Sequence, residues 1–377
     1  MQMRGQGTSG RFAPIAVGAA LLMTVSPARA QVQGFLLSQL DMAFYRGDEK
    51  IDCPEGRSHT VREAFLATQS PDERKRLQLP ENSVEFEKKY KVDYIFDKNG
   101  HDICTDADLF DTPDRGTQKL VQSKIAPGMD LDRAPANGAT EQTCAHDGFT
   151  SPEGEQGVDN QFFRAVACNT FWRGGESGVG DVLGGGGIVW AANPTVVLVR
   201  NVQSWQDDPE VEVEIAAAAD RPAADARQMP SEGASLSITD DPRYRMRAKG
   251  KIEKGVLTTE PRDLVLPFNW NVKSGGEFIV RHMQLRVRLT PDGQLAGKAG
   301  GYRPVDNAIG ILHVGGPGVA GAAGVECASV RKTLRLLADG DPDPKTKQCT
   351  SVSTGLTFSA KPAFVFEKGV LLNPPLQ

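Results

Sequence analysis

Hydrophobic and polar residues alternate with a period of two across much of the second half of the chain. The alternation covers residues 210–215, 243–251 and 282–289, and the turn Pro291-Asp292-Gly293 leads into a further segment at 295–302. Such alternation, with turns at short spacing, is typical of antiparallel strands that bury one face. We therefore predict a mainly β protein built on an antiparallel β-sandwich of the jelly-roll type.

The pattern before this region is helical and irregular. Ser70, followed by Pro71 and two acidic residues, is a typical helix start. We predict a small helical subdomain within residues 31–140. A β-sandwich domain would then span residues 141–377, with one or two packed helices near 158–172 and 325–338.

The first thirty residues carry the features of a secretory signal peptide. Arg4 and Arg11 precede an apolar run at residues 14–25, which is followed by the small-residue cleavage signal Ala28-Arg29-Ala30. The run is shorter than the ~20 residues that span a bilayer, and no later apolar run is long enough. We expect an exported protein, periplasmic or extracellular, with no transmembrane segment once residues 1–30 are removed.

Six cysteines follow the predicted leader: Cys53, Cys104, Cys144, Cys168, Cys327 and Cys349. An even number of cysteines in an oxidising compartment predicts disulfide bonds. Their order along the chain favours three local pairs, Cys53–Cys104, Cys144–Cys168 and Cys327–Cys349. The paired Cys and His spacings of structural zinc sites do not occur in the sequence.

The charge balance argues against a nucleic-acid partner. The formal net charge is -5, and the leader contributes three arginines and no acids, so the chain after the leader is more acidic still. Proteins that bind nucleic acids generally carry a basic footprint for the phosphates. We therefore expect no nucleic-acid partner.

Acidic and amide side chains gather on the glycine-rich segment at residues 147–161. Calcium binds to flexible loops that are rich in such oxygen atoms, so calcium is the candidate cofactor. The candidate ligands are Asp147, Glu153, Glu155, Asp159 and Asn160. In the alternative interpretation, Asp159 or Asn160 caps the following helix and the other acids face solvent.

A basic stripe follows the alternating strands. Its members, which would bind an anionic ligand or polymer, are Arg243, Arg245, Arg247, Arg286 and Arg288. In the alternative interpretation, the stripe pairs with an acidic face on a neighbouring strand, formed by Glu210, Glu212 and Glu214. Such cross-strand pairs set the register of a sheet and stabilise it by ~0.2–1 kcal/mol each.

Two segments carry a resemblance to other proteins. The segment Gly157-Val158-Asp159-Asn160-Gln161, with Cys168 in the helix that follows, resembles a signature in a loose group of exported bacterial proteins of unassigned function. The tail, Asp343-Pro344-Lys345-Thr346 followed by Gln348-Cys349, is similar to theirs as well. The likeness would cover most of the chain after the leader, and it implies no catalytic residue for this sequence.

These observations favour a non-catalytic binding or accessory module with a ligand or protein partner in the cell envelope. The alternative is a hydrolase that acts on an extracellular or periplasmic polymer through paired carboxylates from Glu153, Glu155 and Asp159. A cleft that holds two acids ~5–10 Å apart would favour the hydrolase. Acids that face open solvent would favour the binding module.

Overall fold

The computed structural model describes residues 31–373, except for 46, 102, 104–105, 107–114, 135–137, 174–192, 222–232, 272–273 and 314–325. The predicted signal peptide lies outside these described residues. Every helix in the described part of the chain is too short or too polar to cross a lipid bilayer.

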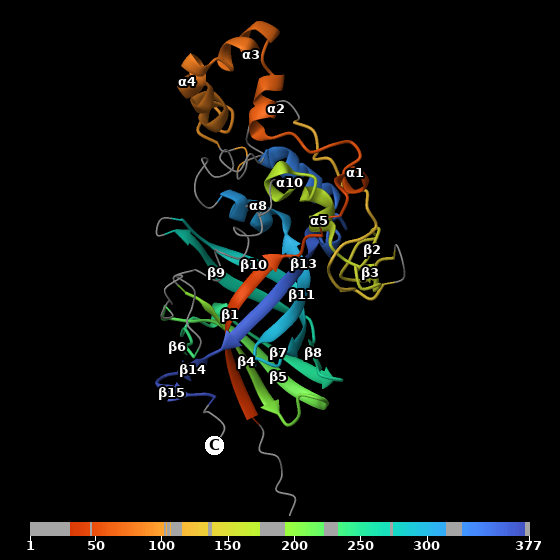
Figure 1. Ribbon diagram of the computed structural model, residues 1–377, viewed down its shortest axis with the longest axis vertical. Coiled ribbons are helices and arrows are strands. Elements are labelled where there is room, and N and C mark those ends of the chain that lie inside the picture. Colours follow the sequence, from red (N-terminus) through yellow and green to blue (C-terminus); the bar gives the residue numbers. More distant parts are fainter. Residues whose placement is uncertain are drawn as a thin grey trace, which may run out of the picture.

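Eight antiparallel strands close into a barrel (Figure 1). The first strand pairs with β4 on one side and with β13 on the other, and the second of these pairings closes the sheet. In order around the barrel the strands are β1 (Gln31–Met42), β4 (Thr195–Val202), β5 (Asp208–Ala217), β7 (Arg245–Glu253), β8 (Val256–Thr259), β10 (Ser274–Leu289), β11 (Leu295–Pro304) and β13 (Cys349–Pro362).

The predicted sandwich is therefore wrong, whereas the mainly antiparallel β character is confirmed. Alternation shows that a strand buries one face, but it does not show whether that face meets a second sheet or the inside of a barrel. Closure depends on β1, whose residues we had expected to belong to a helical and irregular region. Because β1 joins both ends of the sheet, the barrel has no open edge along these strands.

Apolar side chains from all eight strands fill the barrel. On β5, Val211, Val213 and Ile215 belong to this buried core, as the alternation predicts. The interior of an eight-stranded barrel is just wide enough for side chains to fill it. Burial of one large apolar side chain stabilises a fold by ~1.5–3 kcal/mol, so this core is the main source of stability.

A small second sheet covers part of the outer surface of the barrel. It consists of β6 (Ser235–Ser237), β14 (Phe364–Glu367) and β15 (Val370–Leu371). Leu36, Val196 and Leu198 on the outer face of β1 and β4 are buried in a shared apolar cluster with residues of this sheet. The strands beneath it are therefore buried on both faces, which explains the continuous apolar run at residues 196–199.

Three helices cover one end of the barrel (Figure 1). They are α5 (Gln161–Val166), α8 (Val305–His313) and α10 (Cys327–Leu336), and they share an apolar core. The helices α5 and α10 lie within the two ranges that the sequence predicts for packed helices. Three further elements complete this part of the fold: α6 (Thr170–Arg173), β9 (Arg262–Asn271), which pairs with β10, and β12 (Gly340–Pro342), which pairs with β13.

A small helical segment lies beyond this cap, as the sequence predicts (Figure 1). Ser70 accepts a hydrogen bond from the backbone N–H of Glu73, and Pro71 is the first residue of α3, which confirms the expected helix start. The elements are α1 (Glu49–Asp52), α2 (Val61–Ala67), α3 (Pro71–Leu77), the 3₁₀ turn η1 (Pro80–Asn82), α4 (Ser83–Lys88) and the π-helical turn η2 (Lys89–Asp93).

Two disulfide bonds join distant parts of the chain. Cys53 is bonded to Cys168, and Cys144 is bonded to Cys349. The three predicted local pairs are therefore wrong, since each contains at least one cysteine with a different partner; Cys104 lies outside the described residues. Disulfide bonds persist in oxidising compartments, so these two are consistent with an extracytoplasmic location.

Candidate functional site

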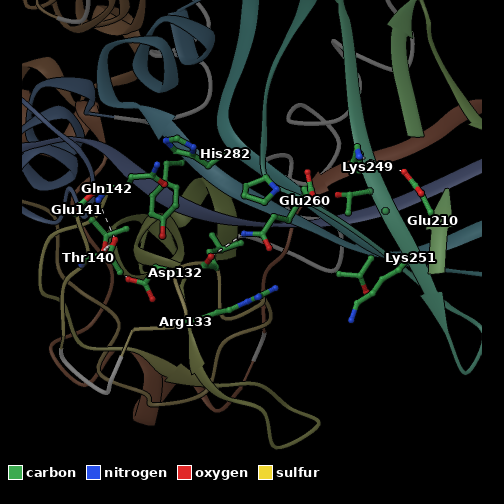
Figure 2. A pocket seen from close by; sticks show the side chains of 18 of the residues that line it. Asp132, Arg133, Thr140, Glu141, Gln142, Glu210, Lys249, Lys251, Glu260 and His282 are labelled. Atoms are coloured by element: carbon green, nitrogen blue, oxygen red, sulfur yellow. Dashed lines mark hydrogen bonds and ion pairs between the residues drawn. The ribbon is translucent and has the colours of Figure 1, made fainter. Parts of the chain in front are cut away.

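A groove of about 890 Å³ lies on the flank of the barrel, beside β7, β8 and β10. Figure 2 shows Thr140, Glu141 and Gln142 on one side of this groove and Lys249, Lys251 and Glu210 on the other. The wall opposite the barrel is the loop at residues 131–143, of which 135–137 are not among the described residues. Most of the lining is polar or charged, so the groove suits a polar ligand.

Small residues allow this loop to lie close against the barrel. At Gly300 on β11, a Cβ atom would lie 3.0 Å from Leu131 Cδ2 and 3.3 Å from Met129 Cε. The side-chain amide of Gln284 on β10 donates a hydrogen bond to the backbone carbonyl of Leu131 (2.9 Å). The loop is therefore fixed to the barrel by packing and by a buried hydrogen bond.

Tyr302 is one of the residues that line the groove. Its side chain is buried, and its hydroxyl has no hydrogen-bond partner in the described part of the chain. At Gly340 a Cβ atom would lie 2.2 Å from the Tyr302 ring, so the ring occupies space that only glycine leaves free. Burial, together with the charges of four aspartates, raises the pKa of the Tyr302 hydroxyl well above its usual range. The phenol therefore stays protonated, and its hydrogen has no acceptor in the described part of the chain.

His146 lies between two buried carboxylates. Its Nε2 is 2.6 Å from Asp159 Oδ1 and 3.7 Å from Asp339 Oδ2, and its Nδ1 is 3.0 Å from the carbonyl of Cys144. Because both ring nitrogens face acceptors, the imidazolium form satisfies them best. Burial lowers the pKa of His146, but Asp159 and Asp339 outweigh it and raise the value to about 9.

The second carboxylate, Asp339, is almost fully buried. Its Oδ1 accepts a hydrogen bond from the backbone N–H of Ser353, whereas Oδ2 has no hydrogen-bond partner among the described residues. Burial raises the pKa of Asp339 to about 7, although the charge of His146 and the hydrogen bonds from Ser353 act in the opposite direction. His146 and Asp339 therefore form an ionic interaction at a site that contains little solvent.

Two further carboxylates lie close to Asp159 and form with it an acidic cluster, which consists of Asp130, Asp132 and Asp159. One carboxylate oxygen from each residue lies within 4.8 Å of the others. The backbone N–H of Leu131 donates to Asp159 Oδ2 (2.6 Å), and the Thr143 hydroxyl donates to Asp132 Oδ2 (2.9 Å). Burial and the neighbouring acids raise the pKa of Asp130, despite a hydrogen bond from the Arg133 backbone. This cluster is the set of described residues that could hold a metal ion.

The acidic cluster connects two pockets. Asp132 lines the flank groove and also a smaller pocket of about 340 Å³, which His146 and Asp159 line as well. The hairpin of β2 (Phe149–Thr150) and β3 (Gln156–Val158) forms part of this smaller pocket. The His146–Asp159 pair can therefore be reached from outside the barrel.

Most of the residues predicted as calcium ligands do not lie in the acidic cluster. Asp159 alone belongs to the acidic cluster. Glu153 pairs with Lys298 (2.7 Å) and Glu155 with Arg286 (2.6 Å), and these two ion pairs attach the hairpin to the barrel. Asp147 lies 3.7 Å from Lys124 at the surface, and Asn160 caps α5 by accepting a hydrogen bond from Phe163, as the alternative interpretation expects.

Most residues of the basic stripe are paired with acids. Glu214 is directly opposite Arg247 in the β5–β7 register, and Glu212 is opposite Lys249, as the ion-pair interpretation expects. Arg245 and Arg247 contact Glu214, while Arg243, in the 3₁₀ turn η3 (Pro242–Tyr244), contacts Asp241 and Glu277. Arg288 is exposed. An anionic ligand would therefore compete with carboxylates at four of the five arginines.

Several residues of the site were not predicted. Asp130, Asp132 and Tyr302 were not candidates, although Asp130 and Asp132 have a spacing that places two carboxylates on one turn. Compared with known proteins, the chain matches no family model, no curated protein and no solved structure. Arguments about function therefore rest on the geometry described above.

Proposed function

We propose that this protein is a non-catalytic binding module of the cell envelope, periplasmic or extracellular, which takes a polar ligand in the flank groove. The observation that carries the proposal is the hydroxyl of Tyr302, a buried donor with no acceptor among the described residues. Buried polar groups in folded proteins nearly always have a partner. Tyr302 lines the groove, and a ligand that displaces the groups covering its hydroxyl would supply an acceptor.

The rest of the lining suggests the chemistry of the ligand. Acidic and basic side chains are nearly balanced, and the uncharged donors and acceptors between them include Thr140, Thr143, Thr258, Thr259, Gln142 and Gln284. A strongly charged ligand would meet like charges whichever its sign. A neutral chain rich in hydroxyl and amide groups, such as a saccharide, fits this lining best.

A neutral oligosaccharide tests this assignment. We expect chitotetraose, which carries hydroxyl and amide groups, to bind in a calorimetric titration. Tyr302→Phe should weaken its binding about tenfold, because one buried hydrogen bond is lost. Lys75→Ala, on exposed α3 far from the groove, serves as the matched control and should bind as the wild type does.

Two results would contradict the proposal that a saccharide binds in the flank groove. Binding that Tyr302→Phe leaves unchanged would place the saccharide elsewhere, and an absence of binding would exclude this class of ligand. Release of shorter oligosaccharides would instead support the hydrolase alternative. That alternative has less support, because Glu153 and Glu155 are paired with basic residues and neither lines the flank groove or the smaller pocket.

Calcium is the ion that we propose for the acidic cluster. The three oxygens lie within 4.8 Å of one another, about twice a calcium–oxygen distance of ~2.4 Å. Asp339, whose buried Oδ2 has no hydrogen-bond partner among the described residues, lies 3.7 Å from the imidazole that Asp159 also contacts and adds a further acidic group to this region. A bound cation would offset this repulsion and hold the groove wall at Asp132.

Thermal unfolding tests the calcium site. We expect millimolar calcium to raise Tm by several degrees relative to a chelator, since an ion at 100 times its Kd stabilises by ~2.7 kcal/mol. Asp130→Asn should abolish the shift. Asp147→Asn is the matched control, because Asp147 belongs to the originally predicted loop but lies outside the acidic cluster. A shift that survives in Asp130→Asn and disappears in Asp147→Asn would assign calcium to the loop instead.

A further inference from the structure

His282 and Asp341 form a hydrogen-bonded pair beside the flank groove. The imidazole Nε2 of His282 lies 3.1 Å from Asp341 Oδ1. His282 lines the groove, and its side chain is 29% exposed. Figure 2 shows it toward the end of the groove where Gln142 lies, away from Lys249 and Lys251. The imidazole is therefore within reach of a ligand in the groove.

Both residues of the pair have an unusual backbone conformation. The φ angle is 48° at His282 and 53° at Asp341, in the left-handed region that residues other than glycine seldom adopt. The register between β10 and β11 shifts between Arg281 and Gln284, so His282 lies in a β-bulge, a feature that often redirects a side chain beside a binding site. Its backbone N–H donates to Asp263 Oδ1 (3.0 Å). The surrounding structure therefore holds the imidazole at the groove.

Asp341 determines which nitrogen of the imidazole is free. In a neutral imidazole, one ring nitrogen carries the hydrogen and the other has a lone pair. Because Nε2 faces the Asp341 carboxylate, Nε2 carries the hydrogen and donates it, and Nδ1 is left as an acceptor. Among the described residues, no group bonds to Nδ1. Unlike the Tyr302 hydroxyl, Nδ1 is not enclosed by protein atoms. A ligand in the groove can therefore reach this acceptor.

We propose, on the basis of the saccharide-binding function above, that His282 Nδ1 accepts a hydrogen bond from a hydroxyl or amide N–H of the ligand in the flank groove. The Tyr302 ring, whose hydroxyl is a donor, lies edge-on to the imidazole, with 6.3 Å between the two ring centroids. A saccharide hydroxyl both donates and accepts, so it suits a position between an acceptor and a donor. A ligand that carries only acceptors, such as a polyphosphate, would leave Nδ1 unpaired.

Two substitutions separate this role from a structural one. The pair also joins β10 to β12, which contains Asp341, and that contact uses Nε2 alone. Asn places its side-chain oxygen where Nδ1 lies and tolerates the left-handed backbone, whereas Gln reaches the position of Nε2. His282→Asn should therefore retain most of the affinity for chitotetraose. His282→Gln should bind it about tenfold more weakly, because one hydrogen bond to the ligand is lost. His59→Asn, at an exposed position outside the groove, is the matched control.

Nuclear magnetic resonance observes Nδ1 directly. A sample labelled at the histidine nitrogens contains five imidazoles, and the signals lost in His282→Asn assign His282. In the free protein, Nδ1 of His282 should resonate as a nitrogen without hydrogen. Saturating chitotetraose should move this resonance to lower frequency, as a hydrogen bond to an acceptor nitrogen does, and should leave the signals of His59 unchanged.

The outcomes distinguish the role of His282 from saccharide binding itself. If calorimetry detects chitotetraose and the Nδ1 resonance does not move, saccharide binding stands and the role of His282 is excluded. A free protein in which both ring nitrogens of His282 carry hydrogen excludes it as well. An absence of calorimetric binding contradicts both proposals. Should His282→Gln fail to fold, the spectrum of the wild type still decides, because the position of the Nδ1 resonance does not depend on that variant.

Discussion

Replacement of Glu214 by glutamine is expected to lower the free energy of unfolding by about 3–5 kcal/mol. Glu214 is fully buried on the outer face of β5, where it accepts hydrogen bonds from Arg200 on β4 and from Arg245 and Arg247 on β7. One carboxylate therefore links three neighbouring strands. Without its charge, Arg247 loses the carboxylate that it contacts, and Arg200 and Arg245 keep only the more exposed Glu212 and Glu367. Urea denaturation should register the loss.

The neighbouring acid on the same strand gives a matched control. Glu212 has the same outward orientation and contacts Arg200 at 3.7 Å, but its side chain is 38% exposed. Exposed ion pairs contribute ~0–1 kcal/mol, so Glu212→Gln should cost less than about 1 kcal/mol. If the two variants lose the same small amount, the carboxylate of Glu214 is not what links the strands.

Glu214 also shows how far the sequence pattern leads. Alternation correctly predicts that Glu210, Glu212 and Glu214 share the outer face of a strand. The pairing of this strand with the basic one is the alternative interpretation of the stripe, and the β5–β7 register agrees with it. It does not distinguish a solvated acid from a buried one. Glu214 is buried because the sheet of β6, β14 and β15 covers this part of the barrel, and Glu367 of β14 reaches Arg245. The segments that cover Glu214 are far away in sequence, so the local hydrophobic pattern does not predict its burial.

Barrel closure escaped prediction for a related reason. A short apolar run at residues 34–37 is compatible with a strand or with a buried helix. This run forms a strand because it pairs with β4 and β13, which lie more than 150 residues later in the chain. The sequence shows that strands are present, whereas their number and the joining of the first to the last depend on long-range pairing.

The candidate site is assembled across the same distances. Asp159 was identified from its own loop, but its neighbours Asp130, His146 and Asp339 come from three other segments. The disulfide Cys144–Cys349 joins two of those segments, next to His146 and close to Asp339. Local pairing of cysteines was the simplest hypothesis for the order of the six, but it ignores such non-local contacts. Mapping of the disulfide bonds would therefore indicate the site better than any local sequence motif.

The pH dependence of stability should reveal the buried charges of this site. The folded pKa of His146 is raised to about 9 from an ordinary value of 6.5, so its stabilising contribution is complete below pH 6.5 and is lost as the pH rises through 9. The raised pKa of Asp339, about 7, acts in the same direction, since folding favours its neutral form. In a chelator, we expect the free energy of unfolding to fall by about 3 kcal/mol between pH 6 and pH 9.

Variants assign this slope to the two groups. His146→Gln should remove most of the decrease above pH 7, because no imidazolium remains to be deprotonated. Asp339→Asn keeps an acceptor for the Ser353 backbone N–H and removes the acidic proton, so the decrease below pH 7 should become shallower. His59→Gln, at an exposed position, should retain the wild-type slope. A slope that persists unchanged in both His146→Gln and Asp339→Asn would mean that other groups control the pH dependence.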